Sequence, residues 1–263
     1  MSPIQIIATI GPRSADSQVI GAMIDAGMSI ARLNFSWGTH EEHRHFVATV
    51  RNEAALRGKQ VLMLQDLSGP RVQSGSAHTF TSEATVFTEK DKADVMALVA
   101  LNIEYIALSF VSSAADIVML RSFLSAHGST AKIIAKIERT EALDNLEEII
   151  QAADGIMIAR GDLGEAIPFE TLPFVKQDIL TLCQLHSKPA IVATEMLSSM
   201  LEDPLPSRAD ISDIADAVVD GASATMLSNE TAVGTNPAEA VAVMRKVVDE
   251  AYKHSTLQPK VWF

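Results

Sequence analysis

Two apolar runs in the middle of the chain end in pairs of opposite charge. These pairs are Lys136 and Glu138 at the end of the run at 132–137, and Arg160 and Asp162 at the end of the run at 155–160. A charged group at the end of a buried strand costs free energy unless another group compensates it. On neighbouring strands, the carboxylates of Glu138 and Asp162 can share a hard cation, Mg²⁺ or Mn²⁺, and leave coordination positions for substrate and water. The spacing therefore predicts a divalent metal site.

Polar residues also end most of the other apolar runs. They are Arg32 and Asn34, Asp66, Thr194 and Glu195, and Ser228 and Glu230. The segment that begins with Gly161 and Asp162 would offer free backbone N–H groups to a carboxylate or a phosphate. For one charge alone, a structural ion pair at the strand ends is the better interpretation. For the whole set at one face, we predict an active site.

Histidine and cysteine residues are interpreted as structural. His40, His43 and His45 lie on a predicted helix, where a solvated polar face is a better interpretation than a metal cluster. Cys183 is expected to be a packed core thiol, because no histidine or carboxylate has the spacing for nucleophilic catalysis. No Ser–His–Asp pattern, Walker loop or zinc-type cluster is present.

Eight apolar runs could supply the strands that position these residues. They lie at 4–10, 29–35, 61–67, 105–110, 132–137, 155–160, 189–194 and 224–228. They are almost continuously apolar, which is typical of parallel strands covered by helices. Helical patterns such as 114–128 and 140–153 lie between them. Left-handed helix C-caps are expected at Gly27, Gly58, Gly128 and Gly221.

This alternation predicts an α/β fold, a single (β/α)8 TIM barrel over residues 1–263. A doubly wound open sheet is the structural alternative, but no glycine-rich dinucleotide loop follows the first strand. The connection at 68–88 is rich in Ser, Thr and Gly and has no helical period, so we expect a long loop with a small hairpin. In such a barrel the carboxyl ends of the strands face the active site.

Bulk properties limit the partners. A formal net charge of −12 argues against nucleic acid or an anionic membrane. The single cysteine excludes an internal disulfide framework and fits a reducing compartment. No apolar run reaches membrane-spanning length, and the first ten residues lack the pattern of a signal peptide. We therefore expect a cytoplasmic protein with a small-molecule substrate.

Seven longer motifs resemble the barrel domain of the pyruvate kinase family, in the same order. They are ATIGPRS (8–14), ARLNFSWGTHEEH (31–43), IALSFV (106–111), IIAKIE (133–138), DGIMIARGDLG (154–164), KPAIVATEML (188–197) and MLSNETAVG (226–234). The resemblance implies that Glu138 and Asp162 hold Mg²⁺ or Mn²⁺. It also implies that Lys136 neutralises the enol oxygen or the transferring phosphoryl group, and that Arg32 binds phosphate.

The same resemblance implies further binding residues. The substrate-binding set would be Arg160, Gly161, Asp162, Thr194 and Glu195, with Thr194 also on the proton route to the methylene carbon. The family's potassium site is matched by Asn34, Ser36 and Asp66. Family barrels pair through their outer helices, which implies a homo-oligomer.

The departures from the family pattern are concentrated on the side of the site that binds the nucleotide in that family. The loop at 68–88 stands in place of the family's lid domain, and the family's C-terminal domain is absent from the sequence. Ser68 and Gln73 replace basic residues, while Arg71 adds a charge at a new place. Trp37 stands where the family has a histidine, and Glu195 where it has a glutamine.

Three functions remain open at this point. The family reaction converts phosphoenolpyruvate and ADP to pyruvate and ATP, and we expect it to be weak without a lid, because phosphoryl transfer requires positioning and water exclusion. A metal-dependent lyase, an oxaloacetate decarboxylase or aldolase, needs only a cation that stabilises the pyruvate enolate and a proton donor. A non-catalytic phosphoenolpyruvate-binding module is the least favoured, because it would not need the metal pair together with Lys136.

Overall fold

Eight parallel strands close into a barrel in the computed structural model, which describes residues 3–74, 77–80 and 85–260. Around the barrel the strand order is β1-β10-β9-β8-β7-β6-β3-β2. The strands are β1 (Gln5–Thr9), β2 (Ile30–Asn34), β3 (Leu62–Asp66), β6 (Tyr105–Leu108), β7 (Lys132–Ile137), β8 (Gly155–Ala159), β9 (Ala190–Ala193) and β10 (Ala224–Leu227). Each strand lies within one of the eight apolar runs, so the prediction of a single (β/α)8 TIM barrel is confirmed.

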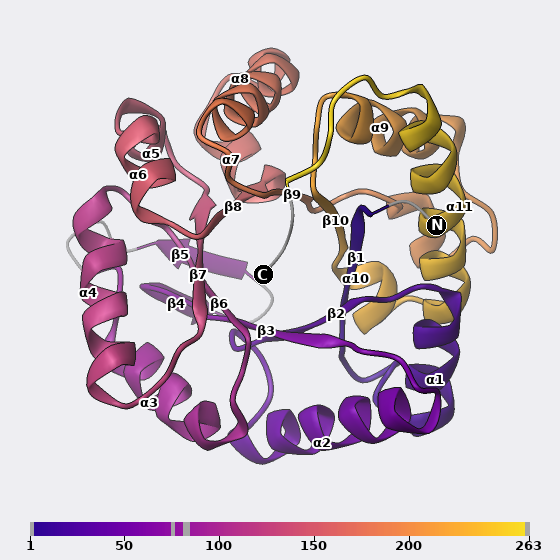
Figure 1. Ribbon diagram of the computed structural model, residues 1–263, viewed down its shortest axis with the longest axis horizontal. Coiled ribbons are helices and arrows are strands. Elements are labelled where there is room, and N and C mark those ends of the chain that lie inside the picture. The colour runs from indigo at the N-terminus through magenta and orange to yellow at the C-terminus, as the bar shows by residue number, and fades with distance from the viewer. Residues whose placement is uncertain (1–2, 75–76, 81–84, 261–263) are drawn as a thin grey trace.

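Helices form the outer ring around these strands (Figure 1). The longer ones are α1 (Ser17–Ala26), α2 (His40–Leu56), α3 (Glu89–Leu98), α4 (Ala114–Ala126), α8 (Leu172–Leu185), α9 (Arg208–Val219) and α11 (Pro237–His254). The shorter ones are α5 (Thr140–Asp144), α6 (Leu146–Ala152), α7 (Arg160–Ala166), α10 (Asn229–Ala232), η1 (Val99–Leu101), η2 (Phe169–Thr171) and η3 (Ser198–Leu201). Among the described residues, no helix combines the length and apolar character needed to cross a membrane.

Local signals in the sequence mark several helix ends. The four glycines expected as C-caps all have positive φ, at +115°, +59°, +72° and +102° in chain order. The helix predicted over 140–153 is instead divided into α5 and α6 at Asn145. There φ is −113° and ψ is 19°, and the Asn145 amide donates to the Ser112 carbonyl at 2.9 Å. A side chain that bonds to backbone outside its own helix competes with the helical conformation.

Alternate residues of each strand face two separate cores. On β1, Ile6 and Ala8 pack toward the helices, whereas Ile7 packs inside the barrel. The interior is filled by large side chains such as Tyr105 and Met157, so it is a packed core and not a channel. Polar groups are therefore concentrated at the strand ends.

Two further expectations concern Cys183 and the connection at 68–88. Cys183 on α8 is buried, and burial raises the pKa of its thiol to about 12, which confirms a packed core thiol. The connection at 68–88 contains an antiparallel hairpin, β4 (Arg71–Ser74) and β5 (Ala77–Phe80). Residues 75–76 and 81–84 of that connection lie outside the described part of the chain.

Candidate active site

Lys136 occupies the centre of the polar end of the barrel. Its Nζ donates to Ser109 Oγ at 2.7 Å and lies 3.2 Å from Asp66 Oδ1 and 2.9 Å from Glu138 Oε1. Burial alone would lower the pKa of Lys136, but Asp66 and Glu138 outweigh it and raise the pKa. The side chain is therefore a buried ammonium held between two carboxylates.

Asp66 positions a second positively charged side chain, Arg32. Its Oδ2 accepts from Arg32 Nε at 2.6 Å, and Arg32 Nη1 donates to Thr9 Oγ1 at 2.9 Å. Burial acts to raise the pKa of Asp66, but Lys136 and Arg32 outweigh it, so the pKa is lowered. Both oxygens of Asp66 thus face protein cations, and Arg32 is held at the wall of a cavity of about 550 Å³.

Glu138 and Asp162 lie close together, as the sequence predicted. Glu138 Oε2 accepts from the Phe110 backbone N–H at 2.6 Å. Its other oxygen makes only ion pairs among the described residues, with Lys136 and, at 3.8 Å, with Arg71 Nη2. Burial raises the pKa of Glu138, and the nearby Asp162 adds to this effect. The same Arg71 nitrogen lies 2.6 Å from Asp162 Oδ2.

The donor set at this place fits a hard divalent cation. Two carboxylates converge, and the buried Glu138 has one oxygen, Oε1, whose partners among the described residues are the cationic side chains of Lys136 and Arg71. No cluster of three or more His, Cys, Asp and Glu residues forms a metal site in the described ranges. The protein would therefore supply the two carboxylates Glu138 and Asp162, and substrate and water would complete the coordination.

Thr194 and Gly161 meet at the ends of β9 and β8. Thr194 Oγ1 accepts from the Gly161 N–H at 2.8 Å and donates to the Ala193 carbonyl at 2.6 Å. Thr194 and the exposed Glu195 have φ of +70° and +55°. Left-handed non-glycine residues cost free energy and are frequent at functional sites.

Arg160 supports this turn through its guanidinium group. Its Nη2 donates to the Thr194 carbonyl at 2.6 Å, and its Nη1 donates to Asp213 Oδ1 at 2.6 Å. The guanidinium is therefore bound to protein groups. Its predicted contact with substrate remains a prediction.

The three residues matched to a potassium site lie at the ends of β2 and β3. Asn34 is the register partner of Asp66, and Asn34 Oδ1 accepts from the Ser36 N–H at 3.1 Å. Lys90 Nζ fastens the adjoining loop by donating to the Phe35 carbonyl at 2.8 Å. A potassium ion at this place remains a prediction.

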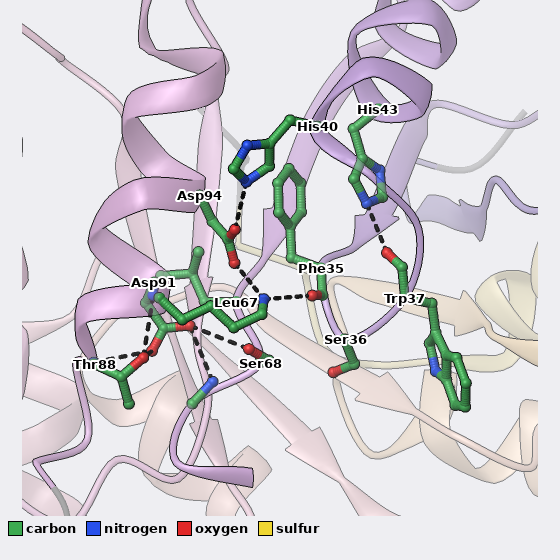
Figure 2. Close-up of polar contacts among 12 residues, drawn as sticks. Phe35, Ser36, Trp37, His40, His43, Leu67, Ser68, Thr88, Asp91 and Asp94 are labelled. Atoms are coloured by element: carbon green, nitrogen blue, oxygen red, sulfur yellow. Dashed lines mark hydrogen bonds and ion pairs between the residues drawn. The ribbon is translucent and has the colours of Figure 1, made fainter. Parts of the chain in front are cut away.

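The start of α2 corrects the prediction for the histidines. His43 is buried, its ring stacks on Phe35 at 4.0 Å, and its Nε2 contacts the Trp37 carbonyl at 2.9 Å (Figure 2). Burial lowers the pKa of His43. A solvated face is thus wrong for His43, because a capping box between Thr39 and Glu42 fixes the helix so that its first turn packs on the β2 loop.

His40 has a different environment from His43. Its Nε2 lies 2.7 Å from Asp94 Oδ1, and Asp94 Oδ2 also accepts from Lys90 at 2.6 Å (Figure 2). His45 is exposed, as predicted. His40 and His43 therefore have different polar partners, the Asp94 carboxylate and the Trp37 carbonyl.

Several site residues were missed from the sequence. Ser109 lies at the end of the fourth apolar run and Thr9 one position before the end of the first, so the search for polar residues at strand ends could have found both, but not the apolar Phe110. Phe110 has φ of +59° and supplies its N–H to Glu138. No local signal predicted that Arg71 would reach Asp162.

Comparison with known proteins decides the family. A family profile described as "Pyruvate kinase, barrel domain" matches residues 1–86 and 79–241. The chain belongs to the pyruvate kinase family. A pyruvate kinase from Geobacillus stearothermophilus is 33% identical over 337 positions that cover 95% of this chain and 57% of that protein. Pyruvate kinases from Mycobacterium tuberculosis (strain ATCC 25618 / H37Rv) and Thermococcus litoralis are 31% and 34% identical, over 97% and 95% of this chain and 71% and 70% of theirs.

The chain spans little more than half the length of the Geobacillus pyruvate kinase. The alignment runs over 337 positions, more than the 263 residues of the chain, so that relative carries residues without a counterpart here. The two segments that match the family profile meet at 79–86, within the connection that contains the β4–β5 hairpin.

Two of the substituted positions have clear environments. Ser68 is buried, and its hydroxyl lies 3.4 Å from Asp91 Oδ1 at the start of α3 (Figure 2). Trp37 is 48% exposed and lines the same cavity as Arg32. The side chain of Gln73 lies outside the described part of the structure.

Proposed function

We propose that this chain acts on phosphoenolpyruvate or pyruvate as a pyruvate kinase-like enzyme, through an enolate stabilised by a divalent metal. The observation that carries the proposal is the buried Lys136 ammonium beside the Glu138–Asp162 carboxylates. The family relationship supports the same substrate class. An enolate oxygen between a bound cation and an ammonium would be strongly stabilised, because a water-poor site strengthens both interactions.

Lys136 and the groups around it have separate proposed roles in this chemistry. Lys136 would donate to the enolate oxygen, and Arg32, oriented by Asp66, would bind the phosphate. The Gly161 N–H would transfer its hydrogen bond from Thr194 to the substrate carboxylate, and the released Thr194 hydroxyl would lie on the proton route. When bound at Glu138 and Asp162, Mg²⁺ or Mn²⁺ would act as a Lewis acid on the keto-acid oxygen.

The nucleotide side supports only weak phosphoryl transfer to ADP. The charged residues that line the larger cavity are Arg32, which Asp66 holds, and the acidic Glu42. Trp37 adds apolar surface there, and a short hairpin stands in the connection where we place the family's lid. A polyphosphate would therefore meet few free cations.

The second candidate is a lyase that acts through the same enolate, as an oxaloacetate decarboxylase or an aldolase. The observation in its favour is the lining of the larger cavity, where Arg32 is the one positively charged residue among those described, Glu42 is acidic and Trp37 adds apolar surface. The kinase reaction is placed first because the relatives named above are pyruvate kinases.

Calorimetry and a set of assays with Mg²⁺ or Mn²⁺ test the proposal. We expect phosphoenolpyruvate or a small α-keto acid to bind, and ADP to bind at least about a hundredfold more weakly than in a complete site, because each lost charge-assisted contact costs about 1.5–3 kcal/mol. The reactions to compare are phosphoenolpyruvate with ADP, phosphoenolpyruvate alone, oxaloacetate, and pyruvate proton exchange in D₂O. Absence of both phosphoenolpyruvate and keto-acid binding would contradict the enzyme proposal. Tight ADP binding with rapid ATP formation would contradict the proposal that this chain binds ADP weakly.

The potassium proposal has its own test. If K⁺ binds near Asn34, Ser36 and Asp66, the rate of the active reaction should be higher in potassium than in sodium buffer, and Asn34→Ala should remove the difference. Equal rates in the two buffers for the unmodified protein would show that no potassium site operates.

A further inference from the structure

Arg71 places a positive charge inside the carboxylate pair that the divalent cation would use. Its Nη2 donates to Asp162 Oδ2 at 2.6 Å and lies 3.8 Å from Glu138 Oε1. The side chain is largely buried and lines a cavity of about 360 Å³ together with Glu138 and Asp162. A guanidinium can bind carboxylates in the absence of a metal, so the protein itself neutralises this pair.

The hairpin holds Arg71 in this position through a specific turn. Gly69 has φ of +64°, and a Cβ at this residue would lie 2.9 Å from the Phe110 ring. The Gly69 N–H donates to Asp91 Oδ1 at 3.1 Å, which ties the turn to α3. The Arg71 guanidinium then lies 4.8 Å from the centroid of the Phe110 ring, in a cation–π contact.

Charge balance shows what a divalent ion would change. Three carboxylates, Asp66, Glu138 and Asp162, face three protein cations, Arg32, Lys136 and Arg71. A divalent ion added to this balanced group would leave an excess of two positive charges beside the buried Asp66 and Glu138, which is unfavourable. Release of Arg71 into solvent would halve the excess, and an anionic substrate would remove the rest.

We propose that Arg71 is an internal competitor for the divalent cation and must leave Asp162 before metal binds to both carboxylates. The inference rests on the proposed function, because it takes Glu138 and Asp162 as the metal ligands. Metal binding is thereby coupled to displacement of the Arg71 side chain at the base of the β4–β5 hairpin. The site would take its cation most readily together with an anionic keto acid.

Mn²⁺ titration, followed by calorimetry and by the electron paramagnetic resonance of free Mn²⁺, tests the competition. Arg71→Gln should bind Mn²⁺ at least about tenfold more tightly than the unmodified chain, because no charge-assisted guanidinium–carboxylate bond has to break. Arg139→Gln is the matched control, since Arg139 lines the same cavity but pairs with Glu141 at 2.8 Å. It should change the affinity by less than about threefold, because Arg139 binds Glu141 and does not have to release either proposed metal ligand.

A second measurement detects Arg71 directly. In the ¹H–¹⁵N spectrum, the Arg71 side-chain Nε signal, assigned by its loss in Arg71→Gln, should move to the position of a solvated arginine as Mg²⁺ saturates the protein. Equal Mn²⁺ affinity in the unmodified chain and Arg71→Gln, or an Arg71 signal unchanged at saturation, would overturn the competition and leave the metal site intact. Absence of Mn²⁺ binding in every variant would overturn both this inference and the metal assignment.

Discussion

Lys136→Met is expected to abolish the enolate reaction and to destabilise the fold. Activity should fall by at least about 10²–10³-fold, the usual effect of removing one group that stabilises a developing oxyanion. The unfolding free energy should fall by about 3 kcal/mol, because Asp66 and Glu138 lose the cation that they share in a buried site. Activity is compared at a temperature where circular dichroism shows both proteins folded, and denaturant unfolding gives the stability.

Lys176→Met is the control for Lys136→Met, because it removes a buried lysine that lies outside the proposed active site. Lys176 is equally buried on α8 and pairs with Asp220 at 3.0 Å, outside the site. Its removal should reduce stability less, because Asp220 is partly exposed and can be hydrated. It should leave activity unchanged. If Lys136→Met retained more than a tenth of the activity, the proposed role of this ammonium would be wrong.

Glu138→Gln and Asp162→Asn are each expected to weaken Mn²⁺ binding by more than about a hundredfold, and to remove metal-dependent activity. A neutral amide is a much poorer ligand for a hard cation than a carboxylate. The fold should persist, because in Glu138→Gln the Phe110 N–H can still donate to the amide oxygen of the substituted side chain. Calorimetric titration with Mn²⁺ measures the loss.

Glu165→Gln is the control for this pair. Glu165 lines the cavity of about 360 Å³ together with Glu138 and Asp162. Its replacement removes one negative charge near the proposed metal ligands and leaves both ligands in place. Its Mn²⁺ affinity should stay within about threefold of the unmodified chain, because an exposed charge is screened by water and salt. A comparable loss in Glu165→Gln would mean that overall negative charge, and not ligation by Glu138 and Asp162, attracts the metal.

The strand ends that carry the site could be predicted from the sequence. The strand core and the polar residue that ends it lie within a few positions of each other, as in the run that leads to Lys136 and Glu138. The barrel then follows from repetition, because eight parallel strands with helical crossovers bring all their carboxyl ends to one face. The positive φ at Gly27 and Gly221 could be predicted for a similar reason, since the backbone requirement falls on one residue.

Other features depend on how loops and helices pack in the folded chain. His43 is buried because the loop after β2 folds back over the first turn of α2 and places Phe35 against its ring. Arg160 binds Asp213 on α9, 53 residues further along the chain. Neither partner can be inferred from a local pattern, because each side chain could equally have faced solvent.

Arg71 shows most clearly what could not be predicted from the sequence. In the sequence it is a single basic residue in a connection without helical period, 91 positions before Asp162. Only the folded barrel brings Asp162, in α7, within reach of the hairpin that follows β3, and the turn at Gly69 precedes the strand that carries the Arg71 guanidinium. The sequence by itself determined which residue types stand at the strand ends. The tertiary structure decided which charges neutralise one another, because burial makes each unpaired charge costly and therefore selects partners across the whole fold.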